Sequence, residues 1–501
     1  MTALIRKVLN ASARFYEGRQ TVLDATARLI CLNYCLAFSA LLPQLKGLFG
    51  SAGILPVRPY LAQITEQTGN LGFLVCPTLF WLNASDASLL VLTLAGSVLS
   101  LIGIFRWTAL MLVFCFVLYL SLLNIGQDFL SFQWDVLLLE SGFLAIFVTN
   151  GPGRPLLPAA IKGLAAALFC MLLFKLMLLS GLCKLASQDA SWSNLEALYF
   201  HFLTQPLPSP LAPFLHALPG TWLKFSCLLT FFIELIFPFL ILAGRSGKLA
   251  AALAFWLLQL AIFLSGNYGF FNLLTAVLCL PLIDDRLFMH LQGKSVCRRR
   301  RALPARLEAR TMPVCFSAAA ILCSIAYANC DILASSAGAN LPLRLLLFLP
   351  RHLYLANSYG LFAVMTTRRM EISIEGSYDG NTYFPYKFYF KPGPADRPPP
   401  IVAPYMPRLD WQMWFEALRA ESGEEASNWF RNFMQGLKNN QEPLTFLIQE
   451  NPFAGKNGPR YLRATIKQYR FNSPKEILRT GLYWRIDAEP FNQEPYYRLG
   501  P

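Results

Sequence analysis

The last third of the chain contains no cysteine and no apolar run long enough to cross a membrane. All 12 cysteines lie between Cys31 and Cys330, so disulfides cannot stabilise the region that follows, which must fold around a packed core. Charged residues are also scarce, at 14% of the chain, whereas hydrophobic residues make up 55%. One soluble core cannot bury that much apolar surface. We therefore expect lipid around one part of the chain and water around the other.

Several motifs of enzymes and metal proteins are also missing. The sequence has no GxSxG elbow, glycine-rich phosphate loop, Ser-His-Asp spacing or zinc-type CxxC pair. His201 and His216 share one polar loop but lack a second histidine at helical spacing, so neither a metal nor another cofactor is expected. The net charge of +14 lies largely beside apolar runs, as in RRRR at 298–301. That placement indicates membrane topology and not nucleic-acid binding.

Apolar segments predict about nine transmembrane helices. A further run at 71–82 is too short to span and predicts a re-entrant or interfacial segment. The basic N-terminal segment 1–28 and the basic loop 286–310 share one side if eight helices separate them, and the positive-inside rule makes that side the cytoplasm. The ninth helix then exports the C-terminal part, whereas a tenth crossing within 336–365 would place that part on the cytoplasmic side. The nine segments are 29–45, 87–105, 107–124, 134–149, 159–182, 222–243, 249–265, 270–283 and 313–334.

A folded, extramembrane domain is expected from residue 366 to the end of the sequence. It follows an apolar connector at 336–365, where prolines and basic residues predict an interfacial helix pair. Asp410 is expected to cap the first helix of the domain. Period-two alternation predicts antiparallel strands, and helical spacing predicts helices that cover one face of the sheet. The strand patterns lie at 370–374, 383–390, 461–471 and 483–486, and the helical patterns at 411–418 and 428–437. The expected fold class is an α-helical polytopic membrane bundle plus a C-terminal α+β, mainly antiparallel β, domain.

Charged side chains inside and beside the apolar segments form the first candidate sites. At membrane depth such groups are costly unless they are paired or hydrated. Lys162 and Lys175 are the candidate partners of the acids in segment 134–149. These charges would suit a polar site or a proton path within the bundle, but the simpler explanation is that they form interhelical hydrogen bonds, or that Lys162 snorkels to the interface. The candidate polar membrane site comprises Asp128, Asp135, Glu140, Lys175 and Glu234. The candidate site in the exported loop comprises Lys184, Asp189, Trp192, His201 and Gln205.

Several blocks of this sequence resemble the lipase maturation factor family. They are GQDFLSFQWDVLLLESGFLAIF at 126–147, SGLCKLASQDASWSNLEALYFHFLTQPLPSP at 180–210, and EGSYDGNTY at 375–383 with PRLDWQMWFEAL at 407–418. Shorter matches, NYGFFNLLT at 267–275, NPF at 451–453 and PRYLRA at 459–464, extend the resemblance over nearly the whole chain. The chain departs from the family pattern at Tyr405, which replaces a histidine, at Ala454, which replaces a proline, and at Tyr483, which replaces the first residue of a tryptophan pair.

The resemblance implies a membrane protein whose exported domain assists the folding and assembly of dimeric secreted lipases, in animals from the endoplasmic reticulum membrane. Short loops and the lack of a retention signal favour a bacterial inner membrane here. The expected partners are membrane lipid and exported client proteins such as lipases, and nucleic acid is not expected. A maturation factor of this kind need not be an enzyme. The candidate client-binding residues are Asp379, Arg408, Asp410, Trp411, Trp414 and Arg460.

Two other functions fit parts of the sequence. The intramembrane acids and the polar loop 184–205 would suit a membrane-embedded enzyme or carrier that acts on a lipid or small molecule. The aromatic C-terminal region would suit a glycan- or envelope-binding module on a membrane anchor, although aromatic residues at helical spacing are more often core.

Overall fold

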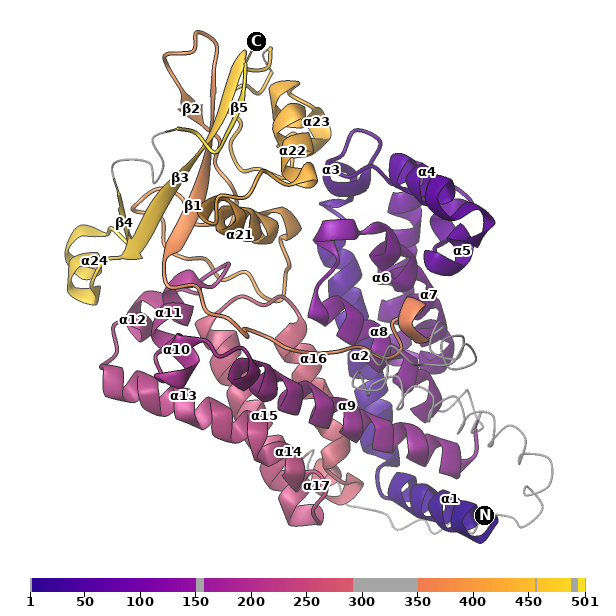
Figure 1. The fold of residues 1–501 in the computed structure, drawn as a ribbon. Helices are drawn as coiled ribbons and strands as arrows, with labels where there is room; N and C mark the ends of the chain where they lie inside the picture. Colours follow the sequence, from indigo (N-terminus) through magenta and orange to yellow (C-terminus); the bar gives the residue numbers. More distant parts are fainter. Residues whose placement is uncertain (1, 150–156, 292–349, 456, 488–493, 501) are drawn as a thin grey trace.

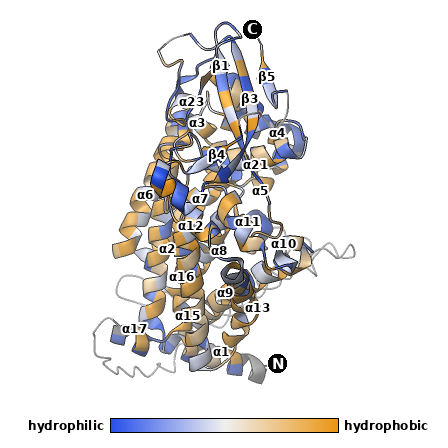
Figure 2. Cartoon of the chain, turned by 90° about the vertical axis from the view of Figure 1, so that its left-hand side faces the viewer, coloured by the Kyte–Doolittle hydropathy of each residue, from blue (hydrophilic) through white to orange (hydrophobic). Residues whose placement is uncertain are grey.

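The computed structural model describes residues 2–149, 157–291, 350–455, 457–487 and 494–500. Helices dominate its first 291 residues, and the named β-strands all follow residue 368 (Figure 1). Hydropathy divides the molecule in the same way, because apolar residues dominate the long helices, whereas polar and apolar residues mix around the sheet (Figure 2). The expected fold class is therefore confirmed.

Six helices among the described residues are long and apolar enough to cross a membrane. Each corresponds to one of the predicted segments, so composition and length locate these helices well. Their bounds are Gln20–Leu41 (α2), Asp86–Phe105 (α6), Thr108–Ile125 (α7), Ala159–Ala186 (α9), Gly220–Leu240 (α13, Gly220–Leu235, with α14, Phe237–Leu240) and Arg245–Ser265 (α15).

The predicted number of nine spans is not confirmed. Segment 134–149 forms α8 (Gln133–Val148), whose 16 residues fall just short of a full crossing. Segment 270–283 forms α16 (Phe271–Leu278) followed by the short helix η4 (Leu280–Leu282). The ninth segment, 313–334, lies outside the described residues. Helix α8 is nevertheless largely buried, and it packs against α2, α7 and α9.

Shorter helices surround the bundle. The run at 71–82 forms η1, α5 and η2, none of which is long enough to span, as its length predicted; its depth in a membrane stays a prediction. The short helices are α1 (Thr2–Glu17), α3 (Leu45–Phe49), α4 (Val57–Thr68), η1 (Gly69–Leu71), α5 (Gly72–Val75), η2 (Leu79–Trp81), η3 (Gln127–Phe129), α10 (Ala190–Ser193), α11 (Ala197–Thr204), α12 (Ala212–His216) and α17 (Asp285–Leu291).

The C-terminal region is built on an antiparallel sheet with the order β2-β1-β3-β4, in which β5 also pairs with β3. The long strands β1 and β3 form its centre, with Ile372 opposite Ile466. Helix α21 contacts β1, and α22 contacts β3 and β5, so apolar residues of both strands are buried beneath them. The elements are β1 (Arg369–Ser377), β2 (Phe384–Pro385), α21 (Arg408–Glu421), α22 (Asn428–Lys438), α23 (Glu442–Thr445), β3 (Tyr461–Phe471), α24 (Pro474–Thr480), β4 (Trp484–Ile486) and β5 (Tyr497–Leu499).

Two details of the predicted domain are wrong. The aromatic run 383–390 gives only the two-residue strand β2; beyond it Tyr386 and Phe388 are buried, whereas Tyr389 is exposed. Asp410 does not cap α21, which begins at Arg408 after Pro407. Its carboxylate instead accepts hydrogen bonds from the backbone N–H groups of Phe390 and Lys391, and so fixes the loop that follows β2.

Residues 350–352 of the predicted connector 336–365 are helical, whereas residues 353–368 contain neither helix nor strand. The predicted interfacial helix pair is therefore wrong for residues 353–365, and residues 336–349 lie outside the described residues. From here on, the connector means residues 353–368. The connector lies along the bundle, and α21 lies between the sheet and the bundle (Figure 1). One continuous set of buried apolar side chains reaches from the long helices into the sheet region. The two parts therefore share a core.

Candidate functional site

A buried ion pair joins the C-terminal region to the bundle. Arg408, the first residue of α21, places its Nη1 and Nη2 at 2.7 and 2.8 Å from the two carboxylate oxygens of Asp135 in α8. Asp135 also accepts a hydrogen bond of 2.5 Å from the hydroxyl of Tyr119, and Arg408 donates to the carbonyl of Phe129 at 3.1 Å. Both charged side chains are at most 1% exposed. A residue predicted to bind clients and a predicted membrane acid therefore satisfy each other.

Polar and aromatic contacts surround this pair. Gln44 accepts a hydrogen bond from the backbone N–H of Arg408 at 2.7 Å and donates to the carbonyl of Met406 at 2.9 Å. Trp411, one turn further along α21, is buried at the centre of a group of rings. Its neighbours from the bundle, at centroid distances of 5.2 to 6.3 Å, are Phe132, Trp134 and Tyr268. We call the contact surface of α21 and the connector with the bundle the junction.

Glu140 forms the second charged centre of the junction. Its Oε1 lies 2.9 Å from the ammonium of Lys175 in α9, which confirms the predicted partner. Its Oε2 accepts hydrogen bonds from the backbone and side-chain nitrogens of Asn357, at 3.1 and 2.9 Å, and from the hydroxyl of Tyr359 at 2.8 Å. Protein donors therefore occupy both oxygens, and a connector segment supplies three of the four donors. This arrangement ties α8, α9 and the connector together.

The rest of the connector is bound by polar side chains of the bundle and of the predicted exported loop. Gln133 exchanges two hydrogen bonds with the backbone of Gly360, at 3.0 and 3.1 Å. The Trp192 indole donates to the carbonyl of Phe362 at 2.9 Å, and Asp189 accepts from the backbone N–H of Met365 at 3.1 Å. Residues 360–365 belong to neither a helix nor a strand, so these side chains supply hydrogen-bond partners that secondary structure would otherwise give the backbone.

A third buried ion pair is separated from the connector by Trp192. The ammonium of Lys184 is 2.7 Å from the carboxylate of Glu234, and it also lies 5.4 Å from the centre of the Trp192 ring. The sequence placed Lys184 and Glu234 in separate candidate sites, whereas the fold brings them together. Lys162 is buried as well, but it donates to the carbonyl of Thr149 at 2.8 Å instead of reaching the α8 acids.

His201 and Gln205 meet at Tyr268. The Tyr268 hydroxyl lies 2.9 Å from Oε1 of Gln205 and 3.0 Å from Nε2 of His201. Because the Gln205 amide nitrogen donates to the carbonyl of Ser265, its oxygen must accept, so the hydroxyl donates to it and Nε2 of His201 carries a proton. Burial, followed by the nearby charge of Lys184, lowers the pKa of His201 to about 4. The imidazole is therefore neutral at physiological pH.

The other predicted residues lie away from these contacts. Asp128 is exposed, and Trp414 is half-buried beside Phe415. Asp379 and Arg460 are exposed, and they lie at the same end of the sheet, because Asp379 follows β1, Arg460 precedes β3, and Ser377 pairs with Tyr461. In Figure 1 this end of β1 and β3 is the one farthest from the long helices. Hydrogen bonds from Thr382, Asn381 and Ser377 lower the pKa of Asp379 to about 2, so this carboxylate organises its own turn. Only part of the predicted client-binding set is therefore accessible.

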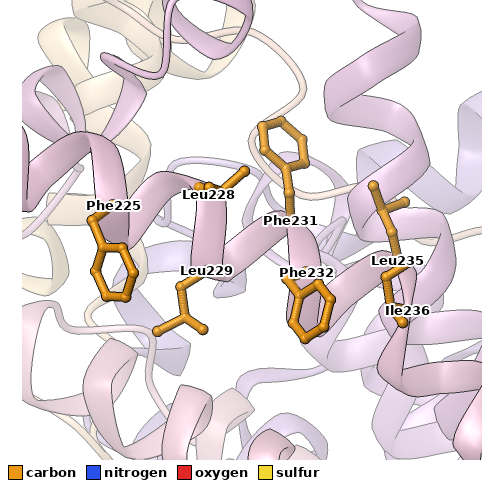
Figure 3. A pocket seen from close by; sticks show the side chains of 7 residues that line it. All are labelled: Phe225, Leu228, Leu229, Phe231, Phe232, Leu235 and Ile236. Atoms are coloured by element: carbon orange, nitrogen blue, oxygen red, sulfur yellow. The ribbon is translucent and has the colours of Figure 1, made fainter.

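The outer face of α13 carries an apolar hollow of about 430 Å³ (Figure 3). A single helical stretch supplies all of its lining, and half or more of the Phe225, Leu228 and Phe232 side chains is exposed. A polar group that could orient a substrate is absent from this lining, so the hollow suits lipid chains better than a reaction. The described residues also contain no cluster of three metal-ligating side chains. The residues lining the hollow are Phe225, Leu228, Leu229, Phe231, Phe232, Leu235 and Ile236.

Asp410 makes stability depend on pH in a testable way. Burial raises the pKa of Asp410 to about 6, despite the hydrogen bonds from Lys391 and Phe390. The folded state therefore binds this proton more tightly than the unfolded state, and stability falls as pH rises from about 4 to about 6. Both backbone hydrogen bonds end on Oδ1, which asparagine retains as a carbonyl. We expect Asp410→Asn to remove this pH dependence and to gain up to about 3 kcal/mol at pH 7.

Thermal unfolding of the full chain in detergent between pH 4 and 8 would measure this effect. Asp410→Ala is the matched control, because it removes the charge and both hydrogen bonds and should lose about 1–3 kcal/mol for each unsatisfied N–H group. An Asp410→Asn variant with the wild-type pH profile would contradict the prediction.

Comparison with known proteins gives a consistent result over both parts of the chain. Residues 22–290 match the family model for the lipase maturation factor transmembrane domain, and residues 355–491 match that for the lipase maturation factor C-terminal domain. Lipase maturation factor 2 of Mus musculus is 34% identical over 567 aligned residues, which cover 88% of this chain and 78% of the relative. Lipase maturation factor 1 of Homo sapiens is 32% identical over 526 aligned residues, which cover 97% and 90%. Solved structures give no match.

Proposed function

Because the chain belongs to the lipase maturation factor family, we propose that it is a membrane-anchored maturation factor that assists the folding or assembly of exported lipases. The observation that carries this proposal is the match of both parts of the chain to relatives that bear this name, over most of their length. The buried pairs support it, because their carboxylates are occupied by protein donors, as expected of a scaffold and not of a catalyst.

The chain is an integral membrane protein, and we propose that its N-terminus is cytoplasmic and its sheet region exported. Helices α1, α14 and α17 lie at the end of the bundle that is opposite to the sheet (Figure 1). Arg14 lies in the last turn of α1, Arg19 lies between α1 and α2, and Lys248 lies in the first turn of α15, which follows α14. Positive charge accumulates on the cytoplasmic side of membrane proteins, which supports this orientation. In a bacterium the membrane would be the inner membrane and the exported compartment the periplasm.

We propose that clients contact the end of the sheet farthest from the membrane. Two exposed aromatic side chains lie there, Tyr378 at 40% and Phe384 at 45% exposure. The Tyr378 hydroxyl donates to the carbonyl of Asn457 at 3.1 Å, so the turn after β1 and the loop before β3 are adjacent. Arg460 and Asp379 add exposed charges of both signs. Aromatic residues and arginine are the commonest energetic anchors of protein interfaces.

Arg460→Glu tests this surface. Arg460 is exposed and follows Pro459 directly before β3, so reversing its charge should leave the fold intact. We expect the variant to lower the activity of a co-expressed exported lipase by at least about fivefold, which corresponds to about 1 kcal/mol at one interface residue. The measurement is lipase activity per amount of exported lipase, in a strain that lacks the chromosomal copy.

Lys475→Glu is the matched control, because Lys475 is also exposed but lies on α24, away from this end of the sheet. Equal losses in the two variants would indicate a general effect of charge and would contradict the proposed surface. If deletion of the whole gene leaves exported lipases fully active, the maturation function itself is wrong.

A further inference from the structure

Two cations share one aromatic ring at the end of the bundle that is farthest from the sheet. The guanidinium carbon of Arg19 lies 4.0 Å from the centre of the Phe15 ring, and the ammonium of Lys248 lies 4.8 Å from it. Phe15 belongs to the last turn of α1, Arg19 directly precedes α2, and Lys248 lies in the first turn of α15. The turn between α1 and α2 and the start of α15, which are distant in sequence, therefore bring two positive charges together.

Asp284 and Asp285 are close enough to act on the charge of Arg19, but neither forms an ion pair with Arg19 or Lys248 among the described residues. Asp284 pairs with Arg245 at 2.8 Å, and Asp285 accepts a hydrogen bond from the backbone N–H of Val22 at 2.9 Å. In the part of the chain that the structure describes, Lys248 has neither a carboxylate within ion-pair distance nor a hydrogen-bond acceptor, only the ring of Phe15. Arg19 donates to the carbonyls of Pro281 and Phe15, at 3.0 and 3.4 Å, which position it without neutralising it. Two like charges at such a site favour an anion between them.

The surrounding elements place these charges at the depth of lipid headgroups. Arg19 directly precedes one candidate membrane span and Lys248 lies near the start of another. Helix α1 packs very closely on α9, since a Cβ atom on Gly163 would lie only 1.8 Å from the carbonyl oxygen of Ser12. Arg14 remains exposed on this helix. A basic helix at the edge of a membrane span is the usual setting for contact with anionic lipid.

We propose that Arg19 and Lys248 bind the phosphate of an anionic phospholipid, with Phe15 as the platform that holds both cations. A phosphodiester supplies the acceptor oxygens that the Lys248 ammonium lacks, and charge-assisted bonds of this kind are short and strong. The net negative charge of the lipid compensates the pair, which a zwitterionic lipid cannot do. This binding does not depend on the proposed action on lipases.

The test uses the purified full chain in detergent, titrated with short-chain phosphatidylglycerol, phosphatidylcholine or inorganic phosphate. Thermal unfolding reports binding, since a ligand that binds only the folded state raises the midpoint. We expect phosphatidylglycerol to raise the midpoint, and Lys248→Met to need at least about tenfold more of it for the same rise. Methionine keeps the length of the apolar stem, so the variant should retain its packing.

Arg14→Ala is the matched control, because it also removes one positive charge at this end of the bundle but leaves Phe15, Arg19 and Lys248 intact. Its unfolding midpoint should respond to phosphatidylglycerol as the wild-type midpoint does. Native mass spectrometry of Lys248→Met and Lys248→Arg gives a second measurement, in which only arginine should preserve bound phosphatidylglycerol. Equal responses of wild type and Lys248→Met, or an equal effect of phosphatidylcholine, would overturn the proposal. An equal effect of inorganic phosphate would also overturn it, in favour of a site for free phosphate.

Discussion

Replacing Arg408 with alanine is expected to destabilise the protein by about 3–5 kcal/mol and to release α21 from the bundle. The variant leaves the Asp135 carboxylate buried, at 0% exposure, with only the Tyr119 hydroxyl as a side-chain partner. It also removes the guanidinium contact with the carbonyl of Phe129. Thermal unfolding in detergent should show the loss. Limited proteolysis should cut the connector faster, because the contact that holds α21 against the bundle is gone.

Two further variants separate the loss of the buried pair from a general effect of removing an arginine. Arg419→Ala, on the same helix, breaks a pair with Glu424 whose side chains are 43% and 53% exposed. It should cost less than about 1 kcal/mol. The double variant Asp135→Leu with Arg408→Met removes both charges, and apolar replacements of a buried pair are often neutral or stabilising. If this double variant is no more stable than Arg408→Ala, an unpaired charge is not the cause.

The second large effect is expected at Glu140. Glu140→Leu leaves the ammonium of Lys175 buried, at 8% exposure, and removes the acceptor of Asn357 and Tyr359. We expect a loss of about 3–5 kcal/mol, low abundance in the membrane and, as a consequence, little active lipase. Because the carboxylate holds the connector, the connector should also become more accessible to protease.

The double variant Glu140→Gln with Lys175→Met distinguishes a structural role from a chemical one, because it removes both charges and keeps an amide oxygen that can accept from Asn357 and Tyr359. If the pair only holds α8, α9 and the connector together, this variant should restore abundance and lipase maturation relative to Glu140→Leu. If Glu140 transfers protons or binds a substrate, abundance will return without function. That second outcome would favour the membrane-embedded enzyme or carrier over the scaffold.

Local patterns predicted the elements well, because each pattern depends on a few neighbouring residues. Apolar length located the long helices, and period-two alternation located β3 at Tyr461–Phe471. Lys175 was found as the partner of Glu140 because consecutive helices, α8 and α9, carry them. Residues 353–365 were misread, since apolar composition suggests a helix and does not reveal side chains elsewhere that bind a backbone outside helices and strands.

The pairing at the junction could not be predicted from one sequence. Asp135 and Arg408 are separated by 273 residues, and no periodicity relates positions at such a distance. The same applies to Lys184 and Glu234, 50 residues apart, which the sequence assigned to different sites. The motif around Arg408 suggested that this residue binds clients, whereas the structure shows that it is buried and paired with Asp135. The only general rule that pointed to these pairs is that an acid inside a membrane needs a partner, and this rule does not identify the partner.

The distance of 273 residues between Asp135 and Arg408 also sets a time during synthesis. At about 5–20 residues per second, a ribosome needs roughly 14–55 s to reach Arg408 after it has made Asp135. For that interval α8 carries an acid whose final partner does not yet exist. Insertion of the helices can begin early, but the junction can close only when α21 has emerged. Nascent chains that stop before Arg408 should therefore be degraded by membrane quality control. For the same reason, the bundle and the sheet region should not accumulate as stable proteins when each is expressed alone.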